Sequence, residues 1–269
     1  MTKGAIQGER MEIDIDYTKS AQENADYCFS MSKKLKRKAE GARAAIKRLE
    51  EQRLIASAAP KKQKLIREIT QRKWYEKFNW FTTSNSMLVI GGRSAIQNEQ
   101  LNSRHFDNQD LFFHADVFGA SVVILKGGVG SAHEIKFEAA QFAVCFSRAW
   151  EGGMASANAY ALKRDQVSKS KEKGSLGTGS FLLAGEREWF KGVPLELCAF
   201  VRSSEQGQQL DIVPISTCVA LGIKKHLTLK PGNMKKSDAA KEIASRLKFD
   251  DIDYIMQRLP PGGASITGT

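Results

Sequence analysis

The sequence predicts an α+β fold in which a basic helical hairpin precedes a mixed domain. Residues 18–57 contain no proline and a single glycine, and they are rich in Ala, Lys, Arg and Glu, which favours one long helix. From Trp74 onward, short β-branched or aromatic runs bounded by Gly or Asp indicate strands. Helical segments lie between these runs without regular strand–helix alternation, which indicates a mixed α+β domain.

The first helix carries a narrow apolar seam, typical of a short coiled coil. The residues of this seam are Ala25, Phe29, Leu35, Ala39, Ala42, Ile46, Leu49 and Leu54. Ala58-Ala59-Pro60 ends the helix, and a second helix is expected from about Lys61 to Phe78. Two helices joined at a proline-containing turn predict an antiparallel hairpin.

The rest of the chain divides into alternating polar and apolar segments. Helices are expected at Arg93–Arg104, Glu134–Trp150, Ser237–Leu247 and Asp250–Arg258. Strands are expected at Met87–Ile90, Leu111–His114, Ser121–Leu125, Met154–Leu162, Ser180–Ala184, Leu195–Arg202 and Leu210–Val219. The aromatic cluster at residues 74–81 stacks bases or, more commonly, forms a core and a hinge for the hairpin.

Positive charge is concentrated in the first third of the chain. The whole sequence has 41 Lys and Arg against 30 Asp and Glu, a net charge of +11, and residues 1–80 hold 19 of these basic residues and 11 of the acidic ones. The densest basic patch consists of Lys33, Lys34, Lys36, Arg37 and Lys38. Such a patch attracts polyanions. A solvated helix face and an acidic membrane surface are the alternatives, but the segment lacks the Trp/Phe/Leu face of an interfacial helix.

Several classes of protein are excluded by composition. No apolar run approaches the roughly 18 residues needed to span a bilayer, and the N-terminal residues lack the apolar core of a signal peptide. Four widely spaced cysteines without a CxxC pair argue against a disulfide framework or a paired-cysteine zinc site, and they fit a reducing compartment. The sequence has only four histidines, which makes a His-rich metal cluster improbable, and it has no Walker A loop. We therefore expect no metal and no cofactor.

Polar side chains at expected strand ends form the candidate site. Gly91-Gly92 permits a tight turn into a helix that starts at Arg93, where backbone N–H groups and the guanidinium favour phosphate. His114 and Asp116 lie two apart on an apolar strand and therefore share a face. They fit a metal, an acid–base pair or a structural pair, and we favour a structural or RNA-contacting role. Ser121 adds a hydrogen-bond donor.

A second group of polar residues leaves a later strand. Gln166, Ser168 and Lys169 begin a basic loop that continues to Gly174 and suits a phosphate backbone. For an isolated loop of this kind, a solvated surface would be the simpler interpretation.

Taken together, these motifs resemble the NFACT family, whose members act in ribosome-associated quality control. IGGRSAIQNE is similar to the family's GGR-D/S-A-x-QNE string and carries Arg93, Gln97, Asn98 and Glu99. FFHADVFGAS resembles HAD-x-HGAS, with Phe118 in place of the second histidine. QVSKS and GSF, at residues 166–170 and 179–181, resemble the family's QVSK…GSF pair.

The resemblance extends to both sides of these motifs. Residues 11–29 are similar to the start of the family's coiled-coil segment, and residues 213–243 to its NFACT-C domain, which points to a eukaryotic cytosolic protein. It implies an N-terminal segment at 1–16, a basic coiled-coil hairpin at 17–73, an NFACT-R RNA-binding domain at 74–205 and an NFACT-C-like domain at 206–269. NFACT-N would precede residue 11, so we expect a fragment, a split protein or a reduced homologue.

The family implies binding to the large ribosomal subunit that carries peptidyl-tRNA, and contact with the ubiquitin ligase listerin. In this scheme Arg93, Lys126 and Lys169 contact phosphate. Asn98, Gln166 and Ser168 bond RNA or buttress the site, and His114 and Asp116 orient it. Two other classes stay open: an RNA-processing hydrolase that uses His114, Asp116 and Glu99, and a protein scaffold in which the charge only solubilises the chain.

Overall fold

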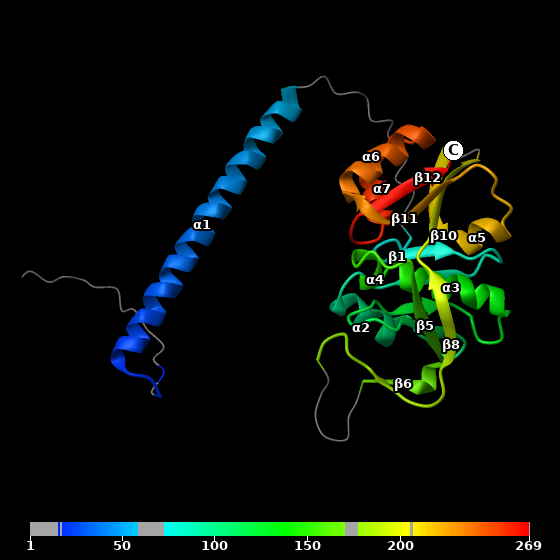
Figure 1. The fold of residues 1–269 in the computed structure, drawn as a ribbon, viewed down its shortest axis with the longest axis horizontal. Coiled ribbons are helices and arrows are strands. Elements are labelled where there is room, and N and C mark those ends of the chain that lie inside the picture. Colours follow the sequence, from blue (N-terminus) through cyan, green and yellow to red (C-terminus); the bar gives the residue numbers. More distant parts are fainter. Residues whose placement is uncertain (1–15, 17, 59–72, 170–176, 205–206, 269) are drawn as a thin grey trace, which may run out of the picture. The chain divides into compact units, whose positions relative to one another are not determined.

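The long helix that the sequence predicts is α1, Ala21–Ala58, in the computed structural model of the chain (Figure 1). The structure describes residues 16, 18–58, 73–169, 177–204 and 207–268. A reciprocal capping pair starts α1: the Glu23 backbone N–H donates to Ser20 Oγ, and the Ser20 backbone N–H donates to the Glu23 carboxylate at 2.8 Å. The chain forms two compact units, Met1–Gln71 and Arg72–Thr269, which are described separately.

The second arm of the expected hairpin lies mostly outside the described residues. Where the description resumes at Lys73, the chain makes turns: the Glu76 N–H donates to the Lys73 carbonyl, and the Phe78 N–H donates to the Tyr75 carbonyl. The expectation that a helix continues to Phe78 is therefore wrong at its end. The physical reason is that Phe78 is fully buried in the core of the second unit and folds with it.

A six-stranded antiparallel sheet forms the first half of the second unit, in the order β1-β2-β4-β3-β5-β8. Its strands are β1 Asn79–Thr82, β2 Leu88–Gly91, β3 Leu111–Ala115, β4 Val123–Leu125, β5 Ser156–Leu162 and β8 Glu188–Pro194. Neighbouring strands in this order pair antiparallel throughout. Strands β2 to β5 correspond to expected strands, whereas β8 lies in a segment for which none was expected.

Helices cover both faces of this sheet because its central strands carry consecutive apolar residues, and successive side chains of a strand point to opposite faces. On one face, Phe113 and Val123 pack against α3, His133–Cys145. On the other face, Phe112 and Ile124 belong to a second core that includes Leu101 of α2, Ala95–Arg104. This second face is also covered by the 3-10 turn η1 Arg164–Gln166 and the short ribbon of β6 Val167–Ser168 and β7 Leu182–Leu183.

Two expected elements are interrupted. The helix expected at Glu134–Trp150 ends at Cys145, because Ser147 caps a new short helix, α4 Arg148–Glu151, by accepting the Ala149 N–H. The strand expected at Leu210–Val219 ends at Pro214, where the chain turns into α5, Ile215–Ala220. Ser147 and Pro214 thus mark the starts of new helices, which the apolar pattern alone does not predict.

A four-stranded antiparallel sheet completes the second unit, in the order β10-β9-β11-β12. Its strands are β9 Leu197–Ser204, β10 Gly207–Pro214, β11 Leu227–Met234 and β12 Ala264–Gly268, with helices α6 Lys236–Leu247 and α7 Ile252–Arg258 alongside (Figure 1). Helices α6 and α7 match expected helices, whereas β11 and β12 were not expected.

The two sheets share one hydrophobic core. Strands β9 and β10, which lie on either side of the domain boundary that the sequence placed between residues 205 and 206, pair antiparallel from Gly207 opposite Ser204 to Pro214 opposite Leu197. Arg258 on α7 donates to the Trp80 carbonyl on β1, and Nε1 of Trp150 donates to the Gly263 carbonyl at 2.8 Å. Arg72–Thr269 is accordingly one compact unit. The domain division expected between residues 205 and 206 stays a prediction.

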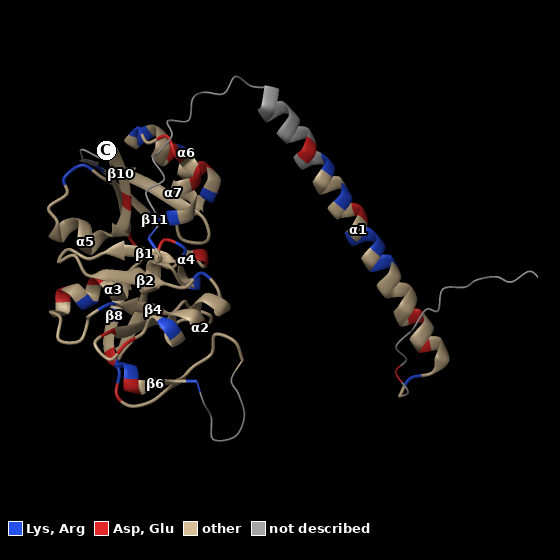
Figure 2. Cartoon of the chain, turned by 180° about the vertical axis from the view of Figure 1, so that it is seen from behind, with Lys and Arg blue, Asp and Glu red and all other residues tan. Residues whose placement is uncertain are grey.

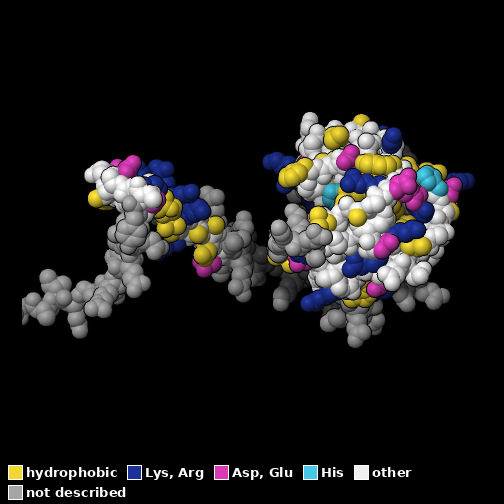
Figure 3. Space-filling model, turned by 90° about the horizontal axis from the view of Figure 1, so that it is seen from below, with side chains coloured by type: hydrophobic (Ala, Val, Ile, Leu, Met, Phe, Trp, Pro, Cys, Tyr) yellow, Lys and Arg dark blue, Asp and Glu magenta, His cyan; other side chains and the backbone are white. Residues whose placement is uncertain are grey.

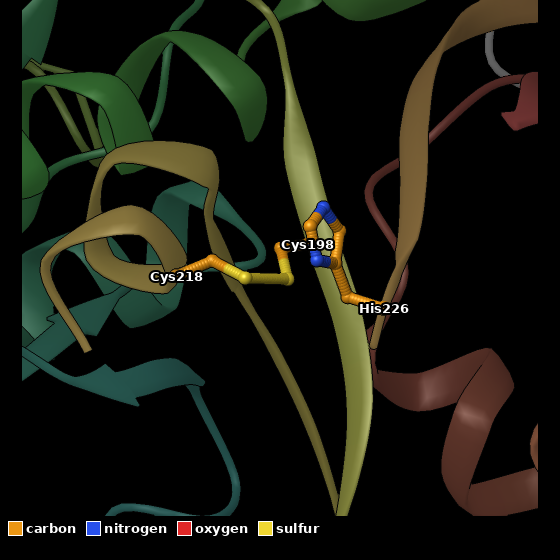
Figure 4. A group of neighbouring side chains, drawn as sticks. All are labelled: Cys198, Cys218 and His226. Atoms are coloured by element: carbon orange, nitrogen blue, oxygen red, sulfur yellow. A yellow bond between two sulfur atoms is a disulfide. The ribbon is translucent and has the colours of Figure 1, made fainter. Parts of the chain in front are cut away.

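One pair of cysteines meets in this second sheet. Cys198 on β9 and Cys218 on α5 form a disulfide, and the His226 ring lies beside it (Figure 4). The two sulfurs and a ring nitrogen of His226 lie within 4.8 Å of one another. The sequence argued against disulfides, and this pair is a correction. The two cysteines are 20 positions apart and meet only because α5 folds back on β9.

Candidate nucleic-acid interface

The turn from β2 into α2 has no room for a side chain at its second glycine. A Cβ atom at Gly92 would lie 2.1 Å from Oδ1 of Asn98. That oxygen accepts the Val122 backbone N–H at 3.2 Å, and Asn98 is buried. Of the two roles expected for Asn98, the contacts support the buttressing one, since its amide ties α2 to the start of β4.

Hydrogen bonds within the first turn of α2 use several of its backbone donors. Ser94 is the N-cap and accepts the Gln97 backbone N–H at 3.3 Å, while Oε1 of Gln97 accepts the Arg93 backbone N–H at 2.9 Å. The Gly179 backbone packs closely on the same turn. A side chain at this position would not fit, since its Cβ would lie 2.8 Å from Cα of Ala95. The phosphate site expected at this helix start therefore has two of its N–H groups already bonded within the chain.

The Arg93 side chain links α2 to the start of the first strand. Nε donates to Asn79 Oδ1 at 3.0 Å, and Nη2 donates to the Phe78 carbonyl at 2.9 Å. Partial burial, with a smaller effect of the Arg258 charge, lowers the pKa of Arg93, which stays protonated at neutral pH. A phosphate contact by Arg93 stays a prediction and would use its remaining donors.

Two lysines expected to contact phosphate have carboxylate partners. Nζ of Lys126 lies 2.8 Å from Asp107 and 2.5 Å from the buried carboxylate of Asp110. Burial opposes the charge of Lys126, but these two carboxylates outweigh it and raise its pKa. Lys169 pairs with Glu99, and this hydrogen bond lowers the pKa of Glu99. Both lysine charges are thus compensated within the chain.

The Gln166 side chain holds the end of the β6–β7 loop. Its Oε1 accepts the Lys163 backbone N–H at 2.8 Å, and its Nε2 donates to the carbonyls of Ala184 and Glu186 at 3.2 and 2.7 Å. Ser168 is exposed on β6 beside it. Gln166 therefore positions the loop, and Ser168 is the member of this pair that faces solvent. Residues 170–176 of the expected basic loop lie outside the described residues.

A row of aromatic side chains crosses three neighbouring strands on the sheet face opposite α3. His114 on β3 pairs with Tyr160 on β5, and Tyr160 pairs with Trp189 on the edge strand β8. Successive ring centroids lie 5.8 Å and 5.3 Å apart. His114 is half-buried and Tyr160 buried, whereas Trp189 is 41% exposed. The row thus leads from the core to an open edge.

Hydrogen bonds fix the inner end of this row. Nε2 of His114 lies 3.1 Å from the Ala120 carbonyl, so it carries the proton and donates, and the Tyr160 hydroxyl donates to Nδ1 at 3.4 Å. Burial lowers the pKa of His114, so the ring is neutral at pH 7. Arg187 covers Tyr160, with its guanidinium 4.5 Å from the Tyr160 ring centroid and 5.8 Å from that of Trp189.

The turn after β3 exposes an aromatic ring beside a cation. Phe118 is 90% exposed, and the Arg148 guanidinium lies 6.0 Å from its ring centroid. Gly119 has a φ of +72° and leaves space for Arg148, whose Nε would lie 3.2 Å from a Cβ there. Asp116 is exposed at the start of this turn and Ser121 is half-buried at its end. At the position of the family's second histidine, this chain therefore presents a phenyl ring.

The basic patch lies on α1, in the unit separate from the sheets. Lys33, Lys34, Lys36, Arg37 and Lys38 are all exposed, and they form a positive band midway along the helix (Figure 2). Among the described residues, none of the five forms an ion pair, and like charges four apart cost about 0.2–0.5 kcal/mol per pair. The patch is therefore a concentrated, uncompensated charge. No helix in the described part of the chain is long and apolar enough to cross a membrane.

The structure thus separates most of the expected site residues into three groups. Gln97, Asn98 and Gln166 hold backbone segments together, and Lys126 and Lys169 pair with acids. Ser168, Asp116 and the patch on α1 face solvent. Tyr160, Arg187, Trp189 and Arg148 were not expected. The pattern REWFK at residues 187–191 contained a signal for two of them, since alternate residues of a strand share a face.

Comparison with known proteins assigns the class of this domain. Residues 77–185 match the family model described as the NFACT protein RNA binding domain. The archaeal Rqc2 homolog aRqcH of Methanocaldococcus jannaschii is 39% identical over 73% of this chain and 30% of its own length. The ribosome quality control complex subunit NEMF homolog of Drosophila melanogaster is 34% identical over 69% of this chain and 19% of its own. The human subunit NEMF is 28% identical over 83% of this chain and 22% of its own.

The matched residues comprise five strands of the six-stranded sheet and its helical covers, so this α+β domain corresponds to the family's RNA-binding domain, and β8 with Trp189 lies just beyond the match. The chain belongs to the NFACT family. It spans between 19% and 30% of the length of the three curated relatives described above.

Proposed function

We propose that this chain is an RNA-binding component of ribosome-associated quality control that acts in the cytoplasm. It binds the large ribosomal subunit that carries stalled peptidyl-tRNA and assists rescue of the nascent chain or recruitment of a ubiquitin ligase. The observation that carries this proposal is the match of residues 77–185 to an RNA-binding domain. The names of the relatives, Rqc2 homolog and NEMF, supply the cellular process.

The charge distribution supports two RNA contacts of different character. The exposed patch on α1 contacts phosphates of ribosomal RNA, because neutralising them releases condensed counterions. Arg93, Ser168 and Asp116 contact RNA at the domain surface, where each has an exposed side chain. Lys126 and Lys169 contribute less, since their charges are compensated by Asp110 and Glu99.

The contacts around His114 favour binding over hydrolysis. Both of its ring nitrogens are engaged, one by the Ala120 carbonyl and one by the Tyr160 hydroxyl. Glu99, the third residue of the alternative hydrolase site, pairs with Lys169. Among the described residues, Cys198, Cys218 and His226 are the one group with metal-ligand spacing, and that group contains none of these three.

Co-sedimentation of the purified chain with large ribosomal subunits tests the proposal. Subunits with and without bound peptidyl-tRNA are compared over a salt series. We expect binding with a steep salt dependence and a preference for the subunit that carries peptidyl-tRNA. Equal binding to any RNA would reduce the chain to a generic basic module, and absence of binding would refute the proposal.

Charge reversal locates the contact on α1. Replacement of Lys33, Lys34, Lys36 and Arg37 by Glu is expected to weaken binding and to lower the salt slope by about one per lost phosphate contact. The matched control reverses four exposed lysines of the second unit, Lys224, Lys225, Lys235 and Lys241, and leaves binding unchanged. Binding that survives reversal on α1 would favour the scaffold alternative.

Helix α1 also presents apolar side chains, which supports a protein contact by the same segment. Phe29 is 77% exposed, and Leu35 and Ile46 are each 56% exposed. Figure 3 shows hydrophobic side chains beside basic ones on this helix. We assign this stripe to contact with the ubiquitin ligase listerin. Replacement of Phe29 and Leu35 by Ser should abolish capture of listerin while ribosome binding persists.

A further inference from the structure

We propose that the exposed face of Trp189 is a stacking platform for one unpaired base of single-stranded RNA, with Arg187 and Lys191 contacting the flanking phosphates. The inference rests on the proposed function and adds to it the kind of RNA that the domain binds. It concerns the outer end of the aromatic row, on the edge strand β8, and involves residues that the sequence did not single out for function.

The platform is built from the alternation of β8. Glu188 and Phe190 face the side of α3, because Glu188 pairs with Lys136 at 3.0 Å and Phe190 is buried in the core beneath α3. Arg187 and Trp189 therefore face the opposite side, away from α3. Strand β8 thus turns Glu188 and Phe190 toward the α3 side of the sheet and presents a cation and an indole on the opposite side.

The indole is held in place before any ligand arrives. Its edge-to-face partner is Tyr160, whose ring lies 5.3 Å away at an interplanar angle of 62°. Tyr160 is buried and bonded to His114, which in turn bonds to the Ala120 carbonyl. Because a buried, hydrogen-bonded chain supports it, Trp189 loses little conformational freedom when a base stacks on it.

The charges around the indole fit a nucleotide rather than a peptide. The Arg187 guanidinium lies 5.8 Å from the Trp189 ring centroid, and no ion pair to another described residue occupies it. Lys191 is exposed two residues beyond Trp189. An aromatic face with one cation over it and a second cation two positions along the strand matches a base between two phosphates. Peptide addition to this edge is disfavoured by the bulge opposite Ala157–Ala159, where Gly192 has a φ of +61°.

A second exposed tryptophan provides a matched comparison. Trp74 is 48% exposed, close to the 41% of Trp189, but its ring is already stacked on His105 at a centroid distance of 4.3 Å and an angle of 19°. One of its faces is therefore occupied within the chain. The two residues have the same chemistry and similar exposure, and they differ in what lies against them.

The experiment measures binding of a labelled single-stranded oligoadenylate and of a hairpin-closed RNA duplex to the full chain by fluorescence anisotropy. We expect Trp189→Ala to weaken single-strand binding roughly 5- to 150-fold, the range for loss of one stacked base. Duplex binding should be unchanged, and a urea denaturation midpoint equal to that of wild type shows that the variant is folded. Trp189→Phe should restore most of the single-strand affinity, and Trp74→Ala should leave it unchanged.

Arg187→Met tests the phosphate contact. It should lower the slope of log affinity against log salt by about 0.7, the value for one phosphate of a single strand. Single-strand binding that is unaffected by Trp189→Ala, or that Trp189→Phe fails to restore, would overturn the platform, whereas the proposed function would still be upheld by preferential co-sedimentation with subunits that carry peptidyl-tRNA. Absence of binding to either RNA would overturn both.

Discussion

Lys126→Met separates the structural role of this lysine from the phosphate contact expected for it. Methionine keeps the length and most of the volume of the side chain but removes the charge. Asp110, whose side chain is 3% exposed, then loses a charged partner at 2.5 Å. Removing one member of a buried ion pair costs about 3–5 kcal/mol.

The expected loss for this pair is smaller, for two reasons visible in the structure. Lys126 is 26% exposed, so water already screens it in part. Asp110 also keeps two backbone donors, the Gly127 N–H at 2.8 Å and the Asp107 N–H at 2.7 Å. We therefore expect a loss of about 2–3 kcal/mol in the free energy of unfolding. For a unit of this size, the melting temperature falls by roughly 4–12 °C.

Urea denaturation of wild type, Lys126→Met, Asp110→Asn and the double variant measures the coupling. Lys126→Met should cost less in the Asp110→Asn background, because no buried charge is then left unpaired. Since the pKa of Lys126 is raised, this stabilisation is full below about pH 10.4 and is lost as pH rises through the folded-state value.

Measurement of RNA binding by Lys126→Met tests whether this lysine also contacts phosphate. At a temperature where Lys126→Met is folded, we expect its affinity for large ribosomal subunits and its salt slope to match wild type. A slope lower by about one would instead identify Lys126 as a phosphate contact. A variant that melts like wild type would refute the reasoning from the Asp110 pair, and Lys224→Met is the control for loss of one exposed lysine.

Three further predictions concern the second unit. Gly92→Ala should lower the free energy of unfolding by about 2 kcal/mol or more in urea titrations, because its Cβ would meet Asn98 Oδ1, whereas Gly177→Ala, with open space around it, should be neutral. Because burial lowers the pKa of His114, stability should fall as pH drops below about 6.5, and a pH series should show a shallower fall in His114→Phe. Reduction of the Cys198–Cys218 disulfide should cost about 3 kcal/mol for a closed loop of this length, and the double alanine variant should melt identically with and without reductant.

Each of these three has a result that contradicts it. Equal stability of Gly92→Ala and Gly177→Ala would mean that Asn98 moves without cost. An unchanged pH slope in His114→Phe would assign the acid sensitivity to other groups, such as His105. A double alanine variant that still responds to reductant would show that the response does not arise from this disulfide.

The sequence predicted those parts of the fold that depend on neighbouring residues. The capped helix α1, the strands β2 to β5, and α6 and α7 follow from local periodicity and breakers. The extent of α3 and the end of β10 did not, because Ser147 and Pro214 interrupt segments whose apolar content continues. The pairing of β9 with β10 on either side of the expected division at residue 205 was also not predicted, because it depends on contacts that the linear pattern does not contain.

The residue types of the candidate site could be predicted from the sequence, but the contacts of these residues could not. Residue types indicated a polar, basic surface, and the resemblance located its motifs. The partners of those residues lie far along the chain, as Lys126 and Asp110 show at a separation of 16. The aromatic row was not predictable, because His114, Tyr160 and Trp189 become neighbours only when three strands align.

The hydrogen bond from Arg258 to Trp80 joins residues 178 positions apart, and it bears on how this protein is made. Synthesis proceeds from the N-terminus, so Trp80 leaves the ribosome long before its guanidinium partner exists. Until α7 emerges, the edge of the first sheet at β1 stays without the cation that lies 4.0 Å from the indole centroid. Contacts of such separation are slow to form, since a long loop must close before they contribute. The RNA-binding unit of a factor proposed to monitor interrupted translation would thus complete its own core only after residue 258 has been synthesised.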